Sequence, residues 1–325
     1  MNTQKNIHNA VLICDRVSNR DGINIFSDNL EFTSNTYFDA ISAALEKCCP
    51  KVYYYDNPSD FIDNIRLHQN DIVLSAIWSG TKSRNRKALI ASICEAHKIK
   101  YLGADTYVQA ICQDKELSKL FVKGSKIKVP RGFTFSKGDE NYNLLDCLHY
   151  PVVVKPNLEG SSIGISDNSI CDTVEEAIKK IKEIISTFSP VLVEEYIPGR
   201  EIAICIAGKN NIDMIEAVEL QIDGNNYFEH QIWGYETKKG GKKSVSRKII
   251  TSEIPSDILN EAKKIYLSFG KVDYMRIDGR LYSDDFYLIE FTPDCSLHPD
   301  CFMYEAFKGE GYSYDEMIAA LINLA

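Results

Sequence analysis

Residues 150–166 read YPVVVKPNLEGSSIGIS, and this stretch decides how the rest of the chain is interpreted. Its apolar run predicts a buried strand that ends at Lys155. The loop that follows contains Gly160, Ser161 and Ser162, small residues that let a backbone approach a ligand closely and that offer amide and hydroxyl donors. A lysine beside such a loop suits a polyphosphate. Because glycine-rich loops are common, this hypothesis depends on what the remaining chain supplies.

The composition predicts a protein with two or three packed lobes. The chain has 325 residues, of which 44% are hydrophobic and 26% charged, and this length is sufficient for more than one core. The formal net charge of -9 argues against nucleic acid as a partner, because non-specific binding to its phosphates requires a basic surface. It does not exclude a local basic pocket for a small anion.

The ten cysteines predict reduced thiols rather than disulfides or a metal site. They are scattered, Cys48 and Cys49 being the only close pair, and several lie in apolar runs. The apolar run at 11–14 is too short for the core of a signal peptide, and no apolar segment approaches membrane-spanning length. The sequence therefore predicts a cytoplasmic protein that does not associate with a membrane.

Strands and helices alternate over the first hundred residues. This alternation is typical of a parallel sheet in a Rossmann-like α/β lobe, which we place at residues 1–110. The predicted elements are the strands 10–14, 52–55 and 71–77 and the helices 38–48 and 87–97.

Two α+β lobes are predicted after it, a central lobe at 111–205 and a C-terminal lobe at 206–325. The central lobe contains a charged helix at 173–186, whose side chains Lys179, Lys180 and Lys182 we expect on a solvated face. The C-terminal lobe is predicted to contain strands at 214–221, 274–280 and 286–291, a loop at 234–246, and helices at 256–270 and 313–324.

An apolar strand runs into the sequence EEYI at residues 194–197. An adenine ring needs apolar walls and a few hydrogen-bonding groups at its edge. Backbone amides at Glu195 and Ile197 would supply them, with Glu194 directed at the exocyclic amine, and Glu201 would accept the ribose hydroxyls. An acidic strand end is also common on protein surfaces, and taken alone this segment favours that interpretation.

Carboxylates and an arginine alternate on two further strands. Alternation places Arg276 and Asp278 on one strand face, and Glu290 and Thr292 on one face of the next. If these strands pair, the oxygen atoms converge as ligands for Mg²⁺, with substrate phosphates completing its shell. The arginine would stabilise negative charge on a reacting carboxyl or phosphoryl group. A surface ion pair between Arg276 and Asp278 is the alternative, but Glu290 lies in an apolar run, where an unpartnered carboxylate is costly.

These segments, together with Lys115 at the predicted start of a helix, resemble the ATP-grasp ligases in order and spacing, and the D-alanine–D-alanine ligase group most closely. The resemblance is good over residues 100–295 and weak before them. It implies a three-lobed fold in which the central and C-terminal lobes hold ATP and Mg²⁺ beneath a mobile loop. It also implies that a carboxylate is activated as an acyl phosphate, which an amine then attacks.

The resemblance implies a role for each matched position. Those implied to bind the nucleotide are Lys115, Lys155, Gly160, Ser161, Ser162, Glu194, Glu195, Tyr196, Ile197, Glu201 and Lys238. Those implied to be catalytic are Arg276 near the acyl phosphate, Lys238 on a flexible loop that reaches the transferred phosphate, and Ser162 in the lid. Those implied to hold magnesium are Asp278, Glu290 and Thr292.

The sequence departs from the family mainly where amino-acid substrates bind. Thr292 stands where the family usually has a metal-binding asparagine, and Lys239 stands where it has a tyrosine. The acidic residue that holds a substrate amine in the family is matched here by Asn19, with Asp21 nearby. Two substrate loops also differ, and they read WSGTKSRN at 78–85 and PDCS at 293–296. The ATP chemistry is therefore predicted to be kept and the substrates to be altered.

The leading hypothesis is an ATP-dependent, ADP-forming carboxylate–amine ligase that joins an amino acid to a second amino acid or amine. A genuine D-alanine–D-alanine ligase is a narrower form of it, and a ligase that forms an ester with D-lactate has no positive support. The alternative of another class is a nucleotide-binding pseudoenzyme, which Thr292 keeps open. A Rossmann dehydrogenase is disfavoured, because no GxGxxG motif follows the first strand. A homodimer is an expectation from the resemblance alone.

Overall fold

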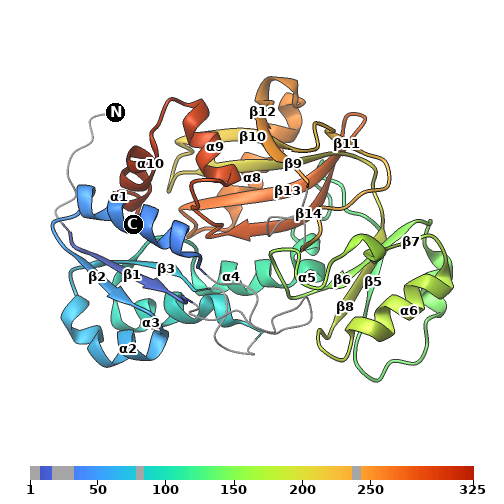
Figure 1. The fold of residues 1–325 in the computed structure, drawn as a ribbon, viewed down its shortest axis with the longest axis horizontal. Helices are drawn as coiled ribbons and strands as arrows, with labels where there is room; N and C mark the ends of the chain where they lie inside the picture. The colour runs from blue at the N-terminus through green and yellow to red at the C-terminus, as the bar shows by residue number, and fades with distance from the viewer. Residues whose placement is uncertain (1–7, 17–32, 78–83, 236–242) are drawn as a thin grey trace.

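The computed structural model describes residues 8–16, 33–77, 84–235 and 243–325, and these form three β-sheets with helices packed around them (Figure 1). The sheet of β1, β2 and β3 lies at the left of Figure 1, and the sheet of β5, β6 and β8 lies at the right. The largest sheet, which contains β9, β13 and β14, lies between and above them.

The N-terminal sheet is parallel, in the order β2-β1-β3-β4. All five residues of β1 are buried, as expected where both faces of a parallel sheet are covered. Helix α1 begins where the Ser34 hydroxyl accepts a hydrogen bond from the amide of Tyr37. The elements are β1 (Ala10–Cys14), α1 (Asn35–Cys48), β2 (Val52–Tyr55), α2 (Pro58–Asn64), β3 (Ile72–Ala76), α3 (Leu89–His97) and β4 (Lys100–Tyr101).

The central sheet is antiparallel, in the order β5-β8-β6-β7, and α6 covers one face of it. Helix α6 contributes Ala177, Ile181 and Ile184 to the core beneath it. The elements are β5 (Gly132–Phe135), β6 (Val152–Pro156), β7 (Ile170–Cys171), α6 (Val174–Ile184) and β8 (Val191–Glu195).

One lysine of α6 is not where the sequence predicted it. Lys179 and Lys182 are exposed, but Lys180 is buried, with an exposed fraction of 3%. Its ammonium group donates to Asn168 Oδ1 at 3.0 Å and pairs with Glu183. The prediction of a solvated face is therefore wrong for Lys180, because polar partners from a neighbouring turn replace its water.

The third sheet is antiparallel, in the order β12-β10-β9-β13-β14, and β11 pairs with β9. Alternate residues of β9 belong to different cores: Ile204 packs on the side of α8, and Cys205 on the side of α9 and α10. The elements are β9 (Gly199–Ala207), β10 (Met214–Ile222), β11 (Tyr227–Phe228), β12 (Val245–Ile249), α8 (Ser256–Ser268), β13 (Tyr274–Tyr282), β14 (Asp285–Pro293), α9 (Phe302–Gly309) and α10 (Tyr314–Ile322).

The three sheets are joined by shared packing. One core contains Leu12 of β1, Leu45 of α1 and Leu321 of α10, so the last helix packs against the N-terminal lobe. Two short helices, α4 (Thr106–Gln113) and α5 (Lys115–Leu120), connect the N-terminal sheet to the other two. The predicted domain boundaries stay a proposal, and the pairing of β9 with β10 and β13 favours a division between β8 and β9 over one at 205.

Most predicted elements occur in the structure within a few residues of the expected bounds. The elements that were not predicted are the helices α2, α4 and α9 and the strands β7, β11 and β12. Strand β12 begins at Val245, inside the predicted loop 234–246, because its charged residues give little of the apolar alternation that marks a strand.

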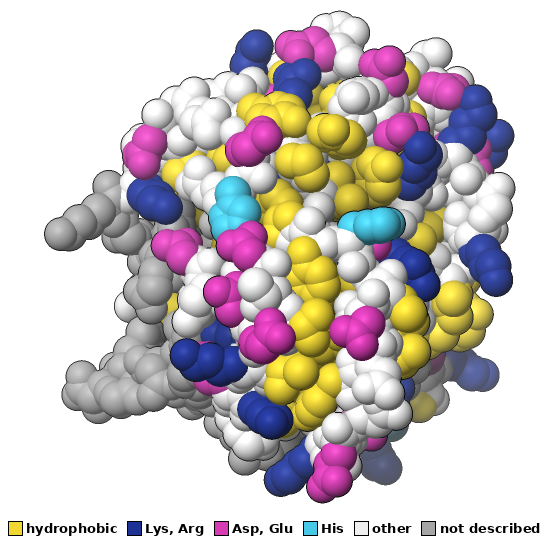
Figure 2. Space-filling view, turned by 90° about the vertical axis from the view of Figure 1, so that its right-hand side faces the viewer, with side chains coloured by type: hydrophobic (Ala, Val, Ile, Leu, Met, Phe, Trp, Pro, Cys, Tyr) yellow, Lys and Arg dark blue, Asp and Glu magenta, His cyan; other side chains and the backbone are white. Residues whose placement is uncertain are grey.

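Charged side chains of both signs are mixed over the face that Figure 2 shows. Lysines and arginines are scattered among aspartates and glutamates there and do not form one basic patch. None of the helices in the described part of the chain has the length and hydrophobicity needed to cross a bilayer.

Candidate functional site

A cavity lies where the central sheet faces the six-stranded sheet, and it has two adjoining parts. The first part, of about 120 Å³, is lined by Lys155, Glu194 and Tyr196 among others. The second, of about 490 Å³, extends toward the N-terminal lobe. Both parts share Lys115 and Glu290, so the two parts meet there.

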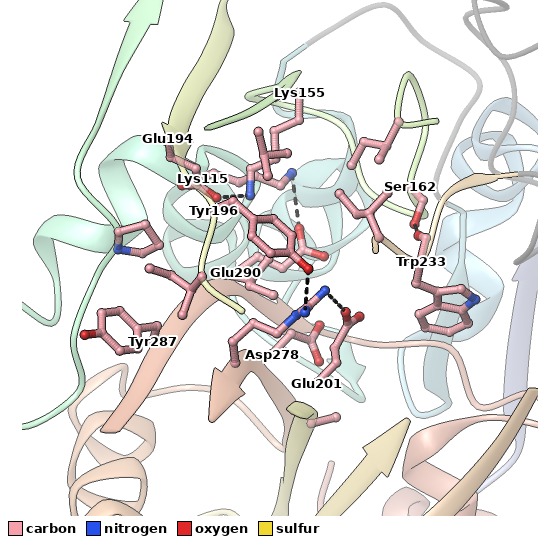
Figure 3. A pocket seen from close by; sticks show the side chains of 18 of the residues that line it. Lys115, Lys155, Ser162, Glu194, Tyr196, Glu201, Trp233, Asp278, Tyr287 and Glu290 are labelled. Carbon is pink, nitrogen blue, oxygen red and sulfur yellow. Dashed lines mark hydrogen bonds and ion pairs between the residues drawn. The ribbon is translucent and has the colours of Figure 1, made fainter. Parts of the chain in front are cut away.

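Asn157 holds the two predicted phosphate-binding lysines side by side. Lys155 is carried by β6, and Lys115 is the first residue of α5. Asn157, which is 1% exposed, accepts from the amide of Glu116 at 3.0 Å and donates to the cap residue Asp114 at 2.7 Å. The start of α5 is therefore fixed to the end of β6, and both ammonium groups point into the cavity (Figure 3).

One buried carboxylate serves two buried ammonium groups. Glu194 pairs with Lys155 at 2.5 Å and also with Lys119, and all three side chains are less than 10% exposed. Burial, together with the positive charge of Lys115, lowers the pKa of Lys155 to about 7. Burial and the neighbouring Lys155 also lower the pKa of Lys119 well below its ordinary value. This excess of positive groups suits a polyanion.

The glycine- and serine-rich loop has a strained backbone. Ser161 and Ser162 have φ of 53° and 59°, which non-glycine residues rarely adopt and which is frequent at ligand sites. The Ser162 hydroxyl donates to the carbonyl of Trp233 at 2.8 Å. The loop therefore contacts the segment that precedes residues 236–242, and Gly160 lines both parts of the cavity.

The end of β8 contributes only one of the two amides predicted for adenine. The amide of Glu195 donates to the carbonyl of Arg131 at 2.8 Å, within the pairing of β8 with β5. That part of the prediction is wrong, because a sheet hydrogen bond already uses the donor. Among the described residues, the amide of Ile197 has no hydrogen-bond partner, and both Ile197 and Tyr196 line the cavity.

An arginine that the sequence analysis did not predict as a site residue contacts two other residues that line the first part of the cavity. Arg280, 4% exposed, pairs with Glu201 at 2.9 Å and lies 3.3 Å from the hydroxyl of Tyr196. That hydroxyl also accepts from the amide of Gln231 at 3.0 Å. Glu201 and Tyr196 are therefore held in place by Arg280, which alternates with Asp278 and Arg276 along β13.

The predicted pairing of the metal-binding strands is present. Asp278 lies opposite Glu290, and Arg276 lies opposite Thr292, in the β13–β14 pair. Arg276 holds both oxygens of Asp278, at 2.6 and 2.9 Å, and the Thr292 hydroxyl donates to Asp278 at 2.9 Å. Burial by itself would lower the pKa of Arg276. The neighbouring Asp278 carboxylate has the larger net effect, so the pKa of the arginine is raised.

The carboxylates fit a magnesium ion that is also bound by phosphates. The described residues include no group of three or more His, Cys, Asp and Glu arranged to hold a metal by themselves. Magnesium does not require one, because it usually keeps waters and binds one or two carboxylates plus substrate phosphates. Glu290 pairs with Lys115 at 3.1 Å, which places this carboxylate beside a lysine that is predicted to bind phosphate.

Several predicted residues lie outside the described part of the chain. These are Lys238, Lys239, Asn19, Asp21 and residues 78–83. Sequence reasoning also missed site residues, namely Lys119, Arg280, Asn157 and Arg247. Lys119 lies one helical turn after Lys115, on the same face of α5. This spacing of four residues is the sequence signal that would have identified Lys119.

A family comparison agrees with this geometry. A model of the family described as "D-ala D-ala ligase C-terminus" matches residues 129–323, more than half of the chain. The chain belongs to the D-alanine–D-alanine ligase family. Membership confirms the predicted class of enzyme, an ATP-dependent ligase that forms an amide bond between a carboxylate and an amine.

Individual members of this family are similar over most of their length. The D-alanine–D-alanine ligase of Halalkalibacterium halodurans is 26% identical over 269 residues, covering 78% of this chain and 83% of the relative. That of Thermotoga maritima is 25% identical over 291 residues, covering 88% and 90%.

Solved structures confirm the ATP-grasp fold. The D-alanine–D-alanine ligase of Bacillus anthracis in complex with ATP has a TM-score of 0.72 at 19% identity, covering 98% of this chain and 97% of the other. The VanG D-Ala:D-Ser ligase of Enterococcus faecalis has a TM-score of 0.72 at 20% identity, covering 98% and 99%.

Proposed function

We propose that this ligase joins the carboxylate of one amino acid to the amine of a second amino acid or amine, through an acyl phosphate. The observation that carries the proposal is the 3.1 Å contact between Lys115 and Glu290. It connects the lysines that suit phosphates with the carboxylates and Arg276 in one continuous cavity. Phosphoryl transfer depends mostly on positioning and charge neutralisation, which this set of residues is suited to provide.

We assign the nucleotide to the first part of the cavity. Lys115 and Lys155 would bind the phosphates, and the loop with Gly160, Ser161 and Ser162 would cover them. The amide of Ile197 would donate to the adenine edge. The further residues of the nucleotide site are Glu194, Glu195, Tyr196 and Glu201, and Lys238, which lies outside the described residues, stays a predicted contact of the transferred phosphate.

Asp278 and Glu290 would hold magnesium, with Thr292 beside them. A bound magnesium ion would neutralise charge on the phosphates. Arg276 orients Asp278 through its two hydrogen bonds. The Thr292 hydroxyl donates a hydrogen bond to Asp278. The lone pairs of the hydroxyl oxygen stay available for a cation.

The reaction proceeds in two steps. A carboxylate oxygen of the first substrate attacks the γ-phosphorus of ATP, the bond to the β-phosphate oxygen breaks, and ADP leaves. The amine nitrogen of the second substrate then attacks the acyl carbon, phosphate leaves with the bonding electrons, and the nitrogen loses a proton. Arg276 lines both parts of the cavity, and we assign it to stabilise the negative charge of the acyl phosphate and of the tetrahedral species.

The relatives favour D-alanine as a substrate, and a structural neighbour named a D-Ala:D-Ser ligase indicates that the second substrate varies within this fold. The residues 293–296, which line the second part of the cavity, differ from the family pattern. We therefore propose an altered second substrate, with D-alanyl-D-alanine synthesis as the second candidate. Complementation of a bacterium that lacks its D-alanine–D-alanine ligase distinguishes the two.

Purified protein supplied with ATP, Mg²⁺ and a panel of D- and L-amino acids tests the proposal. We expect phosphate release that depends on an amino acid, and a dipeptide or amide product by mass spectrometry. Protein that binds ATP but releases no phosphate with any member of the panel would contradict it. Size-exclusion chromatography with light scattering tests the expected homodimer, and fractionation of the cell of origin tests the expected cytoplasmic location.

A further inference from the structure

A charged residue occupies an inward-facing position on β12. Val245, Arg247 and Ile249 alternate along this strand, and the two aliphatic residues pack against the large core. Arg247 lies between them on the same face, with a side chain that is 11% exposed. Placing a guanidinium group there costs free energy unless its donors find partners.

Among the described residues, Arg247 makes one ion pair and has a buried nitrogen without a hydrogen-bond partner. One terminal nitrogen pairs with Asp300 at 2.6 Å, and that aspartate is 79% exposed. The Nε atom is buried and has no hydrogen-bond partner within the described ranges. A buried donor without a partner in a cavity wall is suited to a ligand that brings an acceptor.

Arg247 and Arg276 flank one aromatic ring in the second part of the cavity. Their guanidinium carbons lie 5.1 Å and 5.0 Å from the ring centre of Phe302. Arg276 already donates from two of its nitrogens to Asp278, and the proposed function assigns it to the acyl phosphate. Of the two, Arg247 has the buried donor that is free to bind a substrate group.

An acceptor group in the same cavity is also unused. The side-chain oxygen of Gln113 is buried and lacks a hydrogen-bond partner in the described part of the chain, while its nitrogen donates to the carbonyl of Leu158. An unused donor and an unused acceptor match the two charged groups of an amino acid better than they match a simple amine.

We propose that Arg247 binds a carboxylate of the second substrate, so that the nucleophile is an amino acid with a free carboxylate rather than a simple amine. This inference rests on the proposed function. It makes Arg247 a specificity-determining residue for the second substrate. A bidentate guanidinium–carboxylate pair, formed by Nε and a terminal nitrogen, explains why an arginine is present on an apolar strand face.

The test compares the variant Arg247→Met with the control Lys248→Met, which changes the next residue, on the exposed face of the same strand. The donor amino acid is kept saturating, and the best acceptor of the panel is compared with its own carboxamide. Products are quantified by mass spectrometry, and ATP binding and thermal unfolding are measured for each protein.

We expect Arg247→Met to raise the KM for the carboxylate acceptor about 10- to 100-fold, with kcat and the KM for ATP within about threefold of wild type. Lys248→Met should match wild type. Wild type should use the carboxamide about as poorly as Arg247→Met uses the acid. Arg247→Lys, which keeps the charge but not the planar pair of donors, should lie between them.

Two results overturn the inference. One is wild-type protein that uses the carboxamide as well as the acid, which needs no variant to fold. The other is an Arg247→Met protein whose KM for the acid is unchanged. If neither wild type nor Lys248→Met releases phosphate with any acceptor, the proposed function fails instead, so the two failures are distinguishable.

Discussion

Lys155, Lys119 and Glu194 form a buried group with more positive side chains than negative ones. Such a group is unfavourable by itself, because burial penalises each charge and one carboxylate neutralises one ammonium ion. A polyphosphate bound here, as we propose, would supply the missing negative charge. We therefore expect the ionisation of these lysines to be coupled to ATP binding.

The first prediction concerns pH. Lys155 has a pKa of about 7, and bound phosphates raise it, so above this pH ATP binding takes up a proton. The affinity for ATP should therefore be highest below pH 7 and fall by up to about tenfold for each pH unit above it. Titration calorimetry from pH 6 to pH 9, in two buffers of different ionisation enthalpy, measures both the affinity and the proton uptake.

The control for this experiment is Lys155→Arg, whose guanidinium group keeps its proton throughout this range. The titration of ATP itself is common to both proteins and cancels in the comparison. Equal slopes of affinity against pH in the two proteins would exclude Lys155 as the titrating group.

The second prediction concerns the proposed magnesium ligands. Glu290→Gln removes a negative charge but keeps the shape of the side chain, so phosphate release should fall at least about 100-fold. ATP binding without magnesium should persist, because Lys115 and Lys155 are unchanged. Glu175→Gln, at an exposed position of α6, is the control. A Glu290→Gln protein with the wild-type rate would refute the assignment.

At the scale of single elements, the loop after β6 depends on glycine at one position. Gly164 has φ of +72°, and a Cβ atom added there would lie 2.6 Å from Pro156 Cγ. Pro156 directly follows Lys155, so a displaced loop would move the lysine that we propose binds phosphate. Gly124 has a similar φ of +86°, but an added Cβ would meet nothing within 4 Å.

The third prediction uses this pair of glycines. Gly124→Ala should lower the free energy of unfolding by about 1 kcal/mol through backbone strain alone. Gly164→Ala should lower it by about 2–4 kcal/mol, because steric overlap adds to the strain. Only Gly164→Ala should raise the KM for ATP. Urea unfolding and steady-state kinetics measure these effects, and equal behaviour of the two variants would contradict the steric argument.

The sequence predicted the elements whose pattern is local and failed where partners come from elsewhere in the chain. The apolar run before Lys155 and the alternation of Arg276 with Asp278 are local, and both gave the right strand. Lys180 resembles a surface lysine, because nothing near it in the sequence shows that Asn168 will bind it. The amide of Glu195 looked available, because the pairing with β5 joins residues some sixty positions apart.

At the scale of the whole molecule, a buried polar contact joins the N-terminal lobe to the six-stranded sheet. Asp273, which is 0% exposed, accepts from the amide of Gly103 at 2.8 Å and pairs with Lys271. Lys271 in turn donates to the carbonyl of Gly103 at 2.8 Å. The segment after β4 is thereby tied to the residues before β13.

The fourth prediction is that Asp273→Ala destabilises the protein by about 3–5 kcal/mol, because it removes the carboxylate that pairs with Lys271 and leaves the amide of Gly103 without its acceptor. Unfolding in urea should also become less cooperative, since the lobes lose a connection. Asp257→Ala is the control, because it removes an exposed ion pair with Lys126, which contributes little. Equal urea midpoints of unfolding for Asp273→Ala and Asp257→Ala would exclude a structural role for the contact between Asp273 and Gly103.

The packing of α10 against α1 has a consequence for biosynthesis. Lys47 of α1 pairs with Asp315 of α10 at 2.5 Å, across 268 residues of sequence. At about 5–20 residues per second, the ribosome needs roughly 10 s to 1 min to make the intervening chain. During that interval the apolar face of α1 that packs against α10 is exposed to solvent. The nascent N-terminal lobe is therefore a candidate client for chaperones.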